Sequence, residues 1–253
     1  VTGQLIHAAS DQHVWAQTYD RDLTDIFAIQ SEISQQIAKA LSAALSPQEK
    51  TRLEHVTSVN PEAYDLLLRA RQIDRIGNDT RQELLTQEAM LQKAVTLDPA
   101  YASAWAALSW VHSQIIFNGV DASDARMAKA REAMETARRI DGENPDVQQA
   151  IGTYYYYALR DYPKALEYFE RYARQYPNNY LGYFLTGLVQ RRQGRWAESL
   201  ANLKRASELD PGSPEHARNL MISYAGMRRY ADAVREQERR VRLMPESLRE
   251  SFE

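Results

Sequence analysis

Residues 182–211, GYFLTGLVQRRQGRWAESLANLKRASELDP, decide the fold of this chain. The proline that ends this stretch recurs at a constant distance: Pro177, Pro211 and Pro245 are 34 residues apart, because 211 − 177 and 245 − 211 are both 34. Aromatic, glycine and alanine positions recur in the same order between these prolines. A fixed period in the range of roughly 20–50 residues is the sequence signature of a repeat architecture.

The order of residues within each period resembles the tetratricopeptide repeat (TPR), in which an aromatic residue, Leu-Gly and Tyr are followed by Ala, Phe, Ala and a closing Pro. Residues 182–211 match this pattern closely, and looser copies precede them. The resemblance implies five repeats, at about 61–98, 99–141, 142–176, 177–210 and 211–244. Each repeat is a helical hairpin, and hairpins stack into a right-handed superhelix with a concave groove. The expected fold class is therefore mainly α, a TPR superhelix.

Four consecutive tyrosines, Tyr154 to Tyr157, fall inside the third repeat. They raise two alternatives, an aromatic platform for a ligand or ordinary core packing. Adjacent positions on a helix point about 100° apart, so four neighbouring side chains cannot share one direction. Relative to the 34-residue pattern this repeat has one extra residue, and we expect Tyr155 or Tyr156 to take the packing position. A tyrosine outside that position remains available to a ligand.

Helix-start signals agree with the repeat frame. Asn60-Pro61, Asn144-Pro145 and Ser213-Pro214 each combine a capping side chain with proline at the first helical position. Ser46-Pro47-Gln48-Glu49 adds the glutamate of a capping box. We expect helices to begin at all four sites.

Residues 1–59 do not follow the repeat. Two alternating, β-prone runs flank the turn-like segment 9–12 and predict a β-hairpin. A long amphipathic helix is expected from about residue 25 to residue 45. Its apolar stripe consists of Ile26, Ile29, Ile33, Ile37, Leu41 and Ala44.

This segment resembles the end of a TolB-like (FlgO-like) α/β domain, which joins a signalling output domain to TPRs in many bacterial proteins. The run up to Trp15, the sequence Tyr19-Asp20-Arg21 and residues 25–27 carry the resemblance. It implies that residues 1–59 are the remnant of that domain with connecting helices, and that residues 60–253 form the superhelix. It also implies a larger parent protein with an upstream nucleotide cyclase or winged-helix domain.

Several functional classes find no support in the sequence. A net charge of −3 does not suit a protein that neutralises many phosphates, so we expect no nucleic-acid binding. The chain has no cysteine, its five histidines lack metal-ligand spacing, and no phosphate-binding glycine motif occurs. No apolar run is long enough to span a bilayer. We therefore expect no catalytic residues, no metal site, no cofactor and no membrane segment in a soluble chain, and we favour the cytoplasm over the periplasm.

The TPR resemblance places the binding groove on the first helix of each hairpin, at positions two, five, nine and twelve of the repeat. Carried over by position, these inner-face residues are Trp110 in the second repeat, Gln149, Thr153 and Tyr156 in the third, Leu181, Phe184, Leu188 and Arg191 in the fourth, and Arg218 and Ile222 in the fifth. Aromatic residues and arginines are enriched at binding hot spots. The alternative for each residue is stacking against the adjacent hairpin.

The inner face lacks the residues that recognise one known class of TPR ligand. Gln149, Thr153, Phe184 and Leu188 stand where some TPR proteins place the Lys/Asn clamp for a chaperone's terminal carboxylate. A chaperone-tail receptor is therefore not expected.

Two functional hypotheses remain, with a third in reserve. The first is a non-catalytic module that binds a protein, peptide or helix in the groove, as the sensory or scaffolding end of a bacterial signalling regulator. The second is a self-associating structural module, with a homodimer formed by pairing of the hairpin in residues 1–20. The third is the carboxy-terminal region of a nucleotide cyclase whose catalytic domain lies outside this chain.

Overall fold

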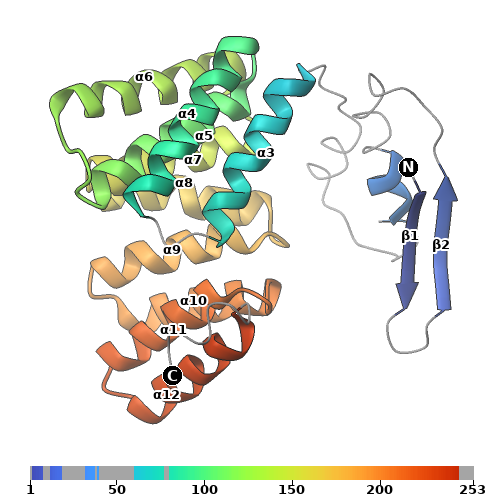
Figure 1. Cartoon of the computed structure of the whole chain (residues 1–253). Helices are drawn as coiled ribbons and strands as arrows, with labels where there is room; N and C mark the ends of the chain where they lie inside the picture. Colours follow the sequence, from blue (N-terminus) through green and yellow to red (C-terminus); the bar gives the residue numbers. More distant parts are fainter. Residues whose placement is uncertain are drawn as a thin grey trace. The chain divides into compact units, whose positions relative to one another are not determined.

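The computed structural model describes residues 2–7, 12–18, 32–37, 39, 60–76 and 80–244. The chain divides into two compact units, Val1–Pro61 and Glu62–Glu253. Figure 1 shows the described elements, coloured from blue at the amino terminus to red at the carboxy terminus.

The first unit contains the expected β-hairpin. Strand β1 (Thr2–His7) pairs antiparallel with β2 (Gln12–Thr18), with Leu5 opposite Trp15 and a register irregularity between Leu5 and Ile6. Residues 32–37 are helical. The rest of the amphipathic helix expected over residues 25–45, and the helix start expected at Ser46, lie outside the described residues. The assignment to a TolB-like domain stays a prediction.

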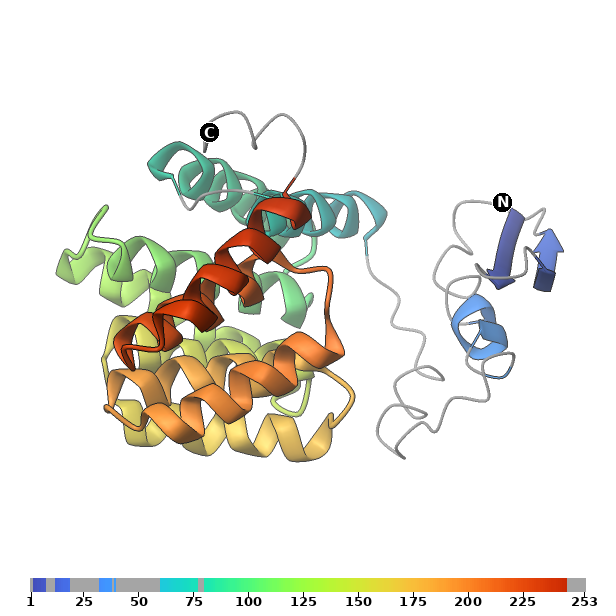
Figure 2. The same ribbon diagram turned by 90° about the horizontal axis from the view of Figure 1, so that it is seen from below.

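The second unit is a stack of helical hairpins (Figures 1 and 2). The first helices of the hairpins are α3 (Pro61–Ile76), α5 (Ala102–Phe117), α7 (Pro145–Thr153) continued by the π-helix η2 (Tyr154–Ala158), α9 (Tyr180–Arg192) and α11 (Pro214–Gly226). The second helices are α4 (Arg81–Leu97), α6 (Asp124–Asp141), α8 (Tyr162–Gln175), α10 (Trp196–Leu209) and α12 (Tyr230–Leu243). The expected α-helical superhelix is confirmed, whereas the exact repeat boundaries stay predictions.

Three of the four expected helix starts are confirmed. Helix α3 begins at Pro61. At α7 the Asn144 side chain accepts a hydrogen bond from the backbone N–H of Asp146 at 2.9 Å. At α11 the Ser213 hydroxyl accepts from the backbone N–H of His216 at 3.4 Å. Each cap satisfies a backbone donor that the helix itself cannot pair.

Close contact between helices depends on glycines at the hairpin seams. A Cβ atom added to Gly152 would lie 2.4 Å from Cε1 of Phe169, and one added to Gly187 would lie 2.8 Å from Cγ of Leu203. Both distances are far below van der Waals contact, so the two helices of a hairpin reach their observed spacing only because these side chains are absent. The packing of α7 on α8 and of α9 on α10 therefore requires glycine.

The buried apolar residues form three clusters that follow one another along the stack. The first joins α3, α4 and α5, the second joins α5, α6 and α7, and the third extends from η2 to α12. Trp105, Trp110 and Tyr155 each pack against two of these clusters. The core is therefore continuous from one hairpin to the next, as expected for a solenoid.

The tyrosine run is not α-helical. Residues Tyr154–Ala158 form a π-helical turn, in which the N–H of Leu159 donates to the carbonyl of Tyr154 at 3.2 Å. A π-turn accommodates one residue more than an α-helical turn, which explains how the third repeat contains its extra residue. Tyr154 and Tyr156 are buried, in different clusters, and Tyr155 and Tyr157 are partly exposed. The tyrosines therefore do not form one platform.

The turn inside each of the last three hairpins uses a left-handed residue at the same repeat position. Arg160, Gly194 and Arg228 have φ values of 55°, 76° and 59° and are 34 residues apart, since 194 − 160 and 228 − 194 are both 34. The N–H of Arg195 returns to the carbonyl of Gln190 at 2.9 Å, the hydrogen bond of a Schellman motif. Of these three repeats, the fourth alone has glycine at this position.

The left-handed turn generates a stability prediction. Gly194→Ala should lower the free energy of unfolding by about 1 kcal/mol, because an L side chain at positive φ is strained. Gly212→Ala is the matched control, since Gly212 has no positive φ and open space around it. Urea denaturation of both variants measures the difference, and equal stabilities would contradict the assignment.

A buried ionic cluster joins α4, α5 and α6. His112 is 2% exposed, and its Nδ1 lies 2.8 Å from Nη1 of Arg126. Arg126 also donates to Glu88 at 2.7 Å and to Asp121 at 3.1 Å. Because Arg126 is always protonated, the neutral His112 accepts through Nδ1. Burial lowers the pKa of His112 to about 4, and the charges of Arg126 and Lys129 act in the same direction against the attraction of Glu88.

This histidine makes stability depend on pH. A histidine whose folded pKa lies below its unfolded value of 6.5 destabilises the fold as pH falls from 6.5 towards 4, because only the unfolded chain binds the proton there. We expect the free energy of unfolding to drop by a few kcal/mol over this window. The variant His112→Gln, which keeps an acceptor for Arg126, should show a shallower slope. Denaturant titrations at stepped pH values measure it, and parallel slopes would refute the role of His112.

Candidate functional site on the first helices

A pocket of about 80 Å³ lies between α3, α4, α5 and α7. It contains two of the expected inner-face residues, Trp110 and Gln149. We call it the Trp110 pocket. Its walls are formed by Ala70, Arg71, Gln87, Leu91, Ala106, Ala107, Trp110, Val111, Asp146, Gln149 and Ala150.

Two polar groups in the Trp110 pocket have no partner among the described residues. The indole Nε1 of Trp110 is buried without a hydrogen bond. Gln87, on α4, is only 3% exposed, and its carboxamide makes no hydrogen bond to any of the described residues. Buried polar groups in native proteins are normally hydrogen-bonded to protein, water or ligand. The Trp110 pocket therefore has unused hydrogen-bonding capacity.

An ion pair connects the first and third hairpins beside these groups. Nη2 of Arg71, on α3, lies 2.9 Å from Oδ2 of Asp146, in the first turn of α7. The two side chains are 44% and 22% exposed, so solvent screens the pair and its contribution to stability is small. Its main consequence for the pocket is that the two charges neutralise each other.

An aromatic group supports Trp110 from the side of η2. The rings of Trp110 and Tyr157 meet edge to face, with centroids 5.9 Å apart. Tyr157 in turn stacks on Phe117, with centroids 4.4 Å apart. These contacts fix the orientation of the indole ring in the wall of the pocket.

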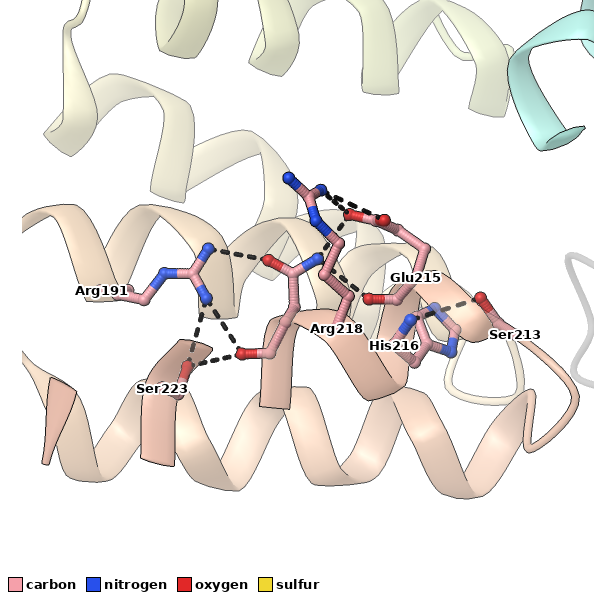
Figure 3. A network of polar contacts seen from close by, with 7 residues as sticks. Arg191, Ser213, Glu215, His216, Arg218 and Ser223 are labelled. Atoms are coloured by element: carbon pink, nitrogen blue, oxygen red, sulfur yellow. Dashed lines mark hydrogen bonds and ion pairs between the residues drawn. The ribbon is translucent and has the colours of Figure 1, made fainter. Parts of the chain in front are cut away.

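The second part of the inner face is a polar network between α9 and α11 (Figure 3). Arg191 donates to the carbonyl and to Oδ1 of Asn219, at 3.1 and 2.7 Å, and to the hydroxyl of Ser223 at 3.2 Å. Asn219 donates in turn to Glu215. Burial lowers the pKa of Arg191. All of these contacts of Arg191 join neighbouring hairpins, so Arg191 is a structural residue.

Arg218 differs from Arg191 in exposure. Its Nη1 donates to both carboxylate oxygens of Glu215, at 3.0 and 3.3 Å, and Figure 3 shows the two side chains projecting away from the helix side by side. The side chain is 47% exposed, and its Nε and Nη2 contact no acceptor among the described residues. Arg218 therefore keeps donors for a partner.

Three of the expected inner-face residues are buried, and we correct their assignment. Thr153 is fully buried, Tyr156 is 2% exposed and Leu188 is 7% exposed. Tyr156 and Leu188 belong to the third apolar cluster. The π-turn begins directly after Thr153, so α-helical spacing does not describe the surface of the third repeat beyond it. These side chains are inaccessible to a ligand in this structure.

The remaining inner-face residues are partly buried. The ring of Phe184 lies 5.0 Å from that of His216, and Leu181 and Phe184 pack against the third cluster. Ile222 is also partly buried. Leu181 and Phe184 therefore combine a packing contact with an exposed edge.

The sequence analysis missed Arg71, Gln87 and Asp146. The register that selects Gln149 as position five of its repeat makes Asp146 position two, so completing the register would have found it. No such signal exists for Gln87, because it lies on a second helix. None exists for Arg71 either, because its contact with Asp146 depends on how α3 and α7 stack in the superhelix.

The two arginines should respond differently to substitution. Arg191→Met removes the N–H groups that donate to Asn219 in a partly buried site. It should lower the free energy of unfolding by about 1–3 kcal/mol. Arg218→Met breaks only an exposed pair and should change it by less than about 1 kcal/mol. Chemical denaturation compares the two, and a larger loss for Arg218→Met would reverse their assigned roles.

Comparison with known proteins agrees with this architecture. Residues 154–214 match the family described as tetratricopeptide repeat. A thermophilic TPR protein of Thermus thermophilus, TTC0263, superimposes with a TM-score of 0.59 over 74% of this chain and 93% of its own, at 17% identity. The helical unit has the fold of a tetratricopeptide-repeat superhelix.

Two further relatives were found. The structure of PilW, a type IV pilus biogenesis factor, has a TM-score of 0.54 over 74% of this chain and 81% of its own, at 19% identity. A protein named "Putative adenylate cyclase 3" from Rhizobium meliloti (strain 1021) is 36% identical over 148 residues. That match covers 57% of this chain, and the chain spans only 24% of the length of this relative.

Neither a membrane span nor a metal site emerges from the described part of the chain. None of its helices has both the length and the apolar composition needed to cross a bilayer. Within the same residues, no three His, Cys, Asp or Glu side chains are grouped so that they could hold a metal ion.

Proposed function

We propose that this chain binds a protein segment, either an extended peptide or a helix, on its inner face, as the sensory or scaffolding part of a bacterial signalling regulator. The observation that carries the proposal is the Trp110 pocket, where a rigid aromatic anchor and unpaired polar groups lie beside each other. Trp and Arg side chains in such positions dominate the energy of many interfaces.

Arg218 extends this surface towards the last hairpin. It keeps free donors, and a guanidinium recognises a carboxylate or backbone carbonyl through its fork of N–H groups. Leu181, Phe184 and Ile222, which are partly buried residues of α9 and α11, supply apolar contact area. The proposed partner surface is thus aromatic at one end and cationic at the other.

A random-peptide display selection on the full chain tests this function. Enriched peptides should bind the wild-type chain in calorimetric titrations, and Arg218→Met should weaken binding by about fivefold or more, which corresponds to about 1 kcal/mol. The melting temperature should stay almost unchanged.

Arg205→Met is the matched control. Arg205 lies on the second helix α10, pairs with Glu208 three residues later, and its side chain is also 47% exposed. Its substitution should leave the dissociation constant unchanged. Equal weakening by both substitutions, or no enrichment of any peptide, would count against binding on the inner face.

A nucleotide cyclase parent is a further proposal. The similarity to the Rhizobium meliloti protein supports it, because that relative is named as an adenylate cyclase. In this proposal the chain is the carboxy-terminal region and the catalytic domain lies in upstream sequence. Reading the coding sequence upstream of Val1 decides the matter: a cyclase domain is expected, and a winged-helix domain there would reject it.

Self-association is the second candidate function, and the hairpin favours it. The described part of the chain contains one two-stranded sheet, β1 with β2. An isolated two-stranded ribbon is marginally stable, and its edges present unpaired N–H and C=O groups. We propose that a second copy pairs with residues 1–20 about a two-fold axis.

Sedimentation analysis tests this dimer. The full chain should sediment as a dimer, whereas a fragment that starts at Ser46 should be monomeric. Monomer masses for both would eliminate strand pairing as the mode of association, without bearing on the inner face.

A further inference from the structure

We propose that the Trp110 pocket is a subsite for an uncharged carboxamide, the side chain of an asparagine or glutamine in the bound segment. This inference rests on the proposed binding function and names the chemistry that the inner face selects. Three properties of the pocket carry it, namely its unpaired groups, its charge balance and its size.

The unpaired groups require a ligand that both accepts and donates. The carboxamide of Gln87 offers two donors and an acceptor. Gln149, on α7, adds a second carboxamide to the wall, and it too makes no hydrogen bond within the described part of the chain. A ligand carboxamide can exchange donor and acceptor contacts with both glutamines, while the Trp110 ring forms the wall beside them.

The charge balance disfavours ions. Arg71 and Asp146, both in the wall of the pocket, already neutralise each other at 2.9 Å. A carboxylate would lose hydration while facing Asp146, and an ammonium group would face Arg71 in the same way. Moving an ion out of water without a free counter-charge is costly, so the pocket favours a neutral polar group.

The size fits a short side chain. A volume of about 80 Å³ holds about five water-sized groups. A hydroxyl group would leave most of that space to water. A side chain that ends in a carboxamide fills more of it and can pair with the carboxamide of Gln87.

Propionamide is the probe for this subsite, with sodium propionate and ethylammonium chloride as charged probes of similar size. The readout is the indole ¹H–¹⁵N resonance of Trp110 in the full chain, identified by its loss in Trp110→Phe. Propionamide should move this resonance in a saturable way, and each charged probe should bind at least about fivefold more weakly. The Trp105 indole is an internal control, because its Nε1 already donates to the carbonyl of Pro99 at 2.9 Å.

Gln87→Leu tests the contribution of the buried carboxamide. It should weaken propionamide binding by about fivefold or more, and the unchanged Trp105 resonance reports that the fold is intact. If this variant unfolds, the comparison of the three probes on the wild-type chain still decides the proposal. Stronger binding of propionate, or no movement of the Trp110 resonance with any probe, overturns it.

Failure of the subsite and failure of the proposed function are distinguishable. Selected peptides that bind the inner face while propionamide does not would reject the subsite alone. Saturable binding of propionamide without any selected peptide would reject the peptide-binding function and leave a small-molecule pocket.

Discussion

The close contact between the two helices of the third and fourth hairpins is the constraint on which the rest of the structure depends. At Gly152 a single added carbon would collide with the ring of Phe169, and at Gly187 it would collide with Leu203. Only at this spacing do the large side chains fill the seam, and the apolar surface left over must be covered by the next hairpin. The 34-residue period is therefore a packing requirement repeated along the chain.

Stacking also creates the candidate site. It brings Arg71 of the first hairpin to Asp146 of the third, and it encloses Gln87 and Trp110 between them. The arrangement of these side chains suits recognition rather than chemistry, because it offers hydrogen-bond donors and acceptors around an aromatic ring. Both helices of the hairpins supply the core: Phe169 and Leu203 on second helices, and Leu108 and Leu185 on first helices, are fully or almost fully buried.

The sequence predicted most of the fold because its strongest signals are local. Helix starts are marked by proline at the first helical position, at Pro61, Pro145 and Pro214, and the repeats are marked by a constant period. Both signals depend on residues close together in the chain, which a single sequence displays. The π-turn at Tyr154–Ala158 could not be predicted in the same way: an extra residue is visible in the sequence, but whether a loop or a helix absorbs it depends on packing against α8. The site was predicted less well, since Thr153 and Tyr156 proved buried and Gln87 lies on a helix that repeat positions do not select.

Hydrogen–deuterium exchange with and without a selected peptide tests most directly whether the partner binds the surface of the first helices. The account predicts that the peptide slows exchange in α5, α7 and α11, which carry Trp110, Gln149 and Arg218, and leaves α6, α8 and α10 unchanged. Protection confined to the second helices would contradict it, because the partner would then bind the opposite surface of the superhelix.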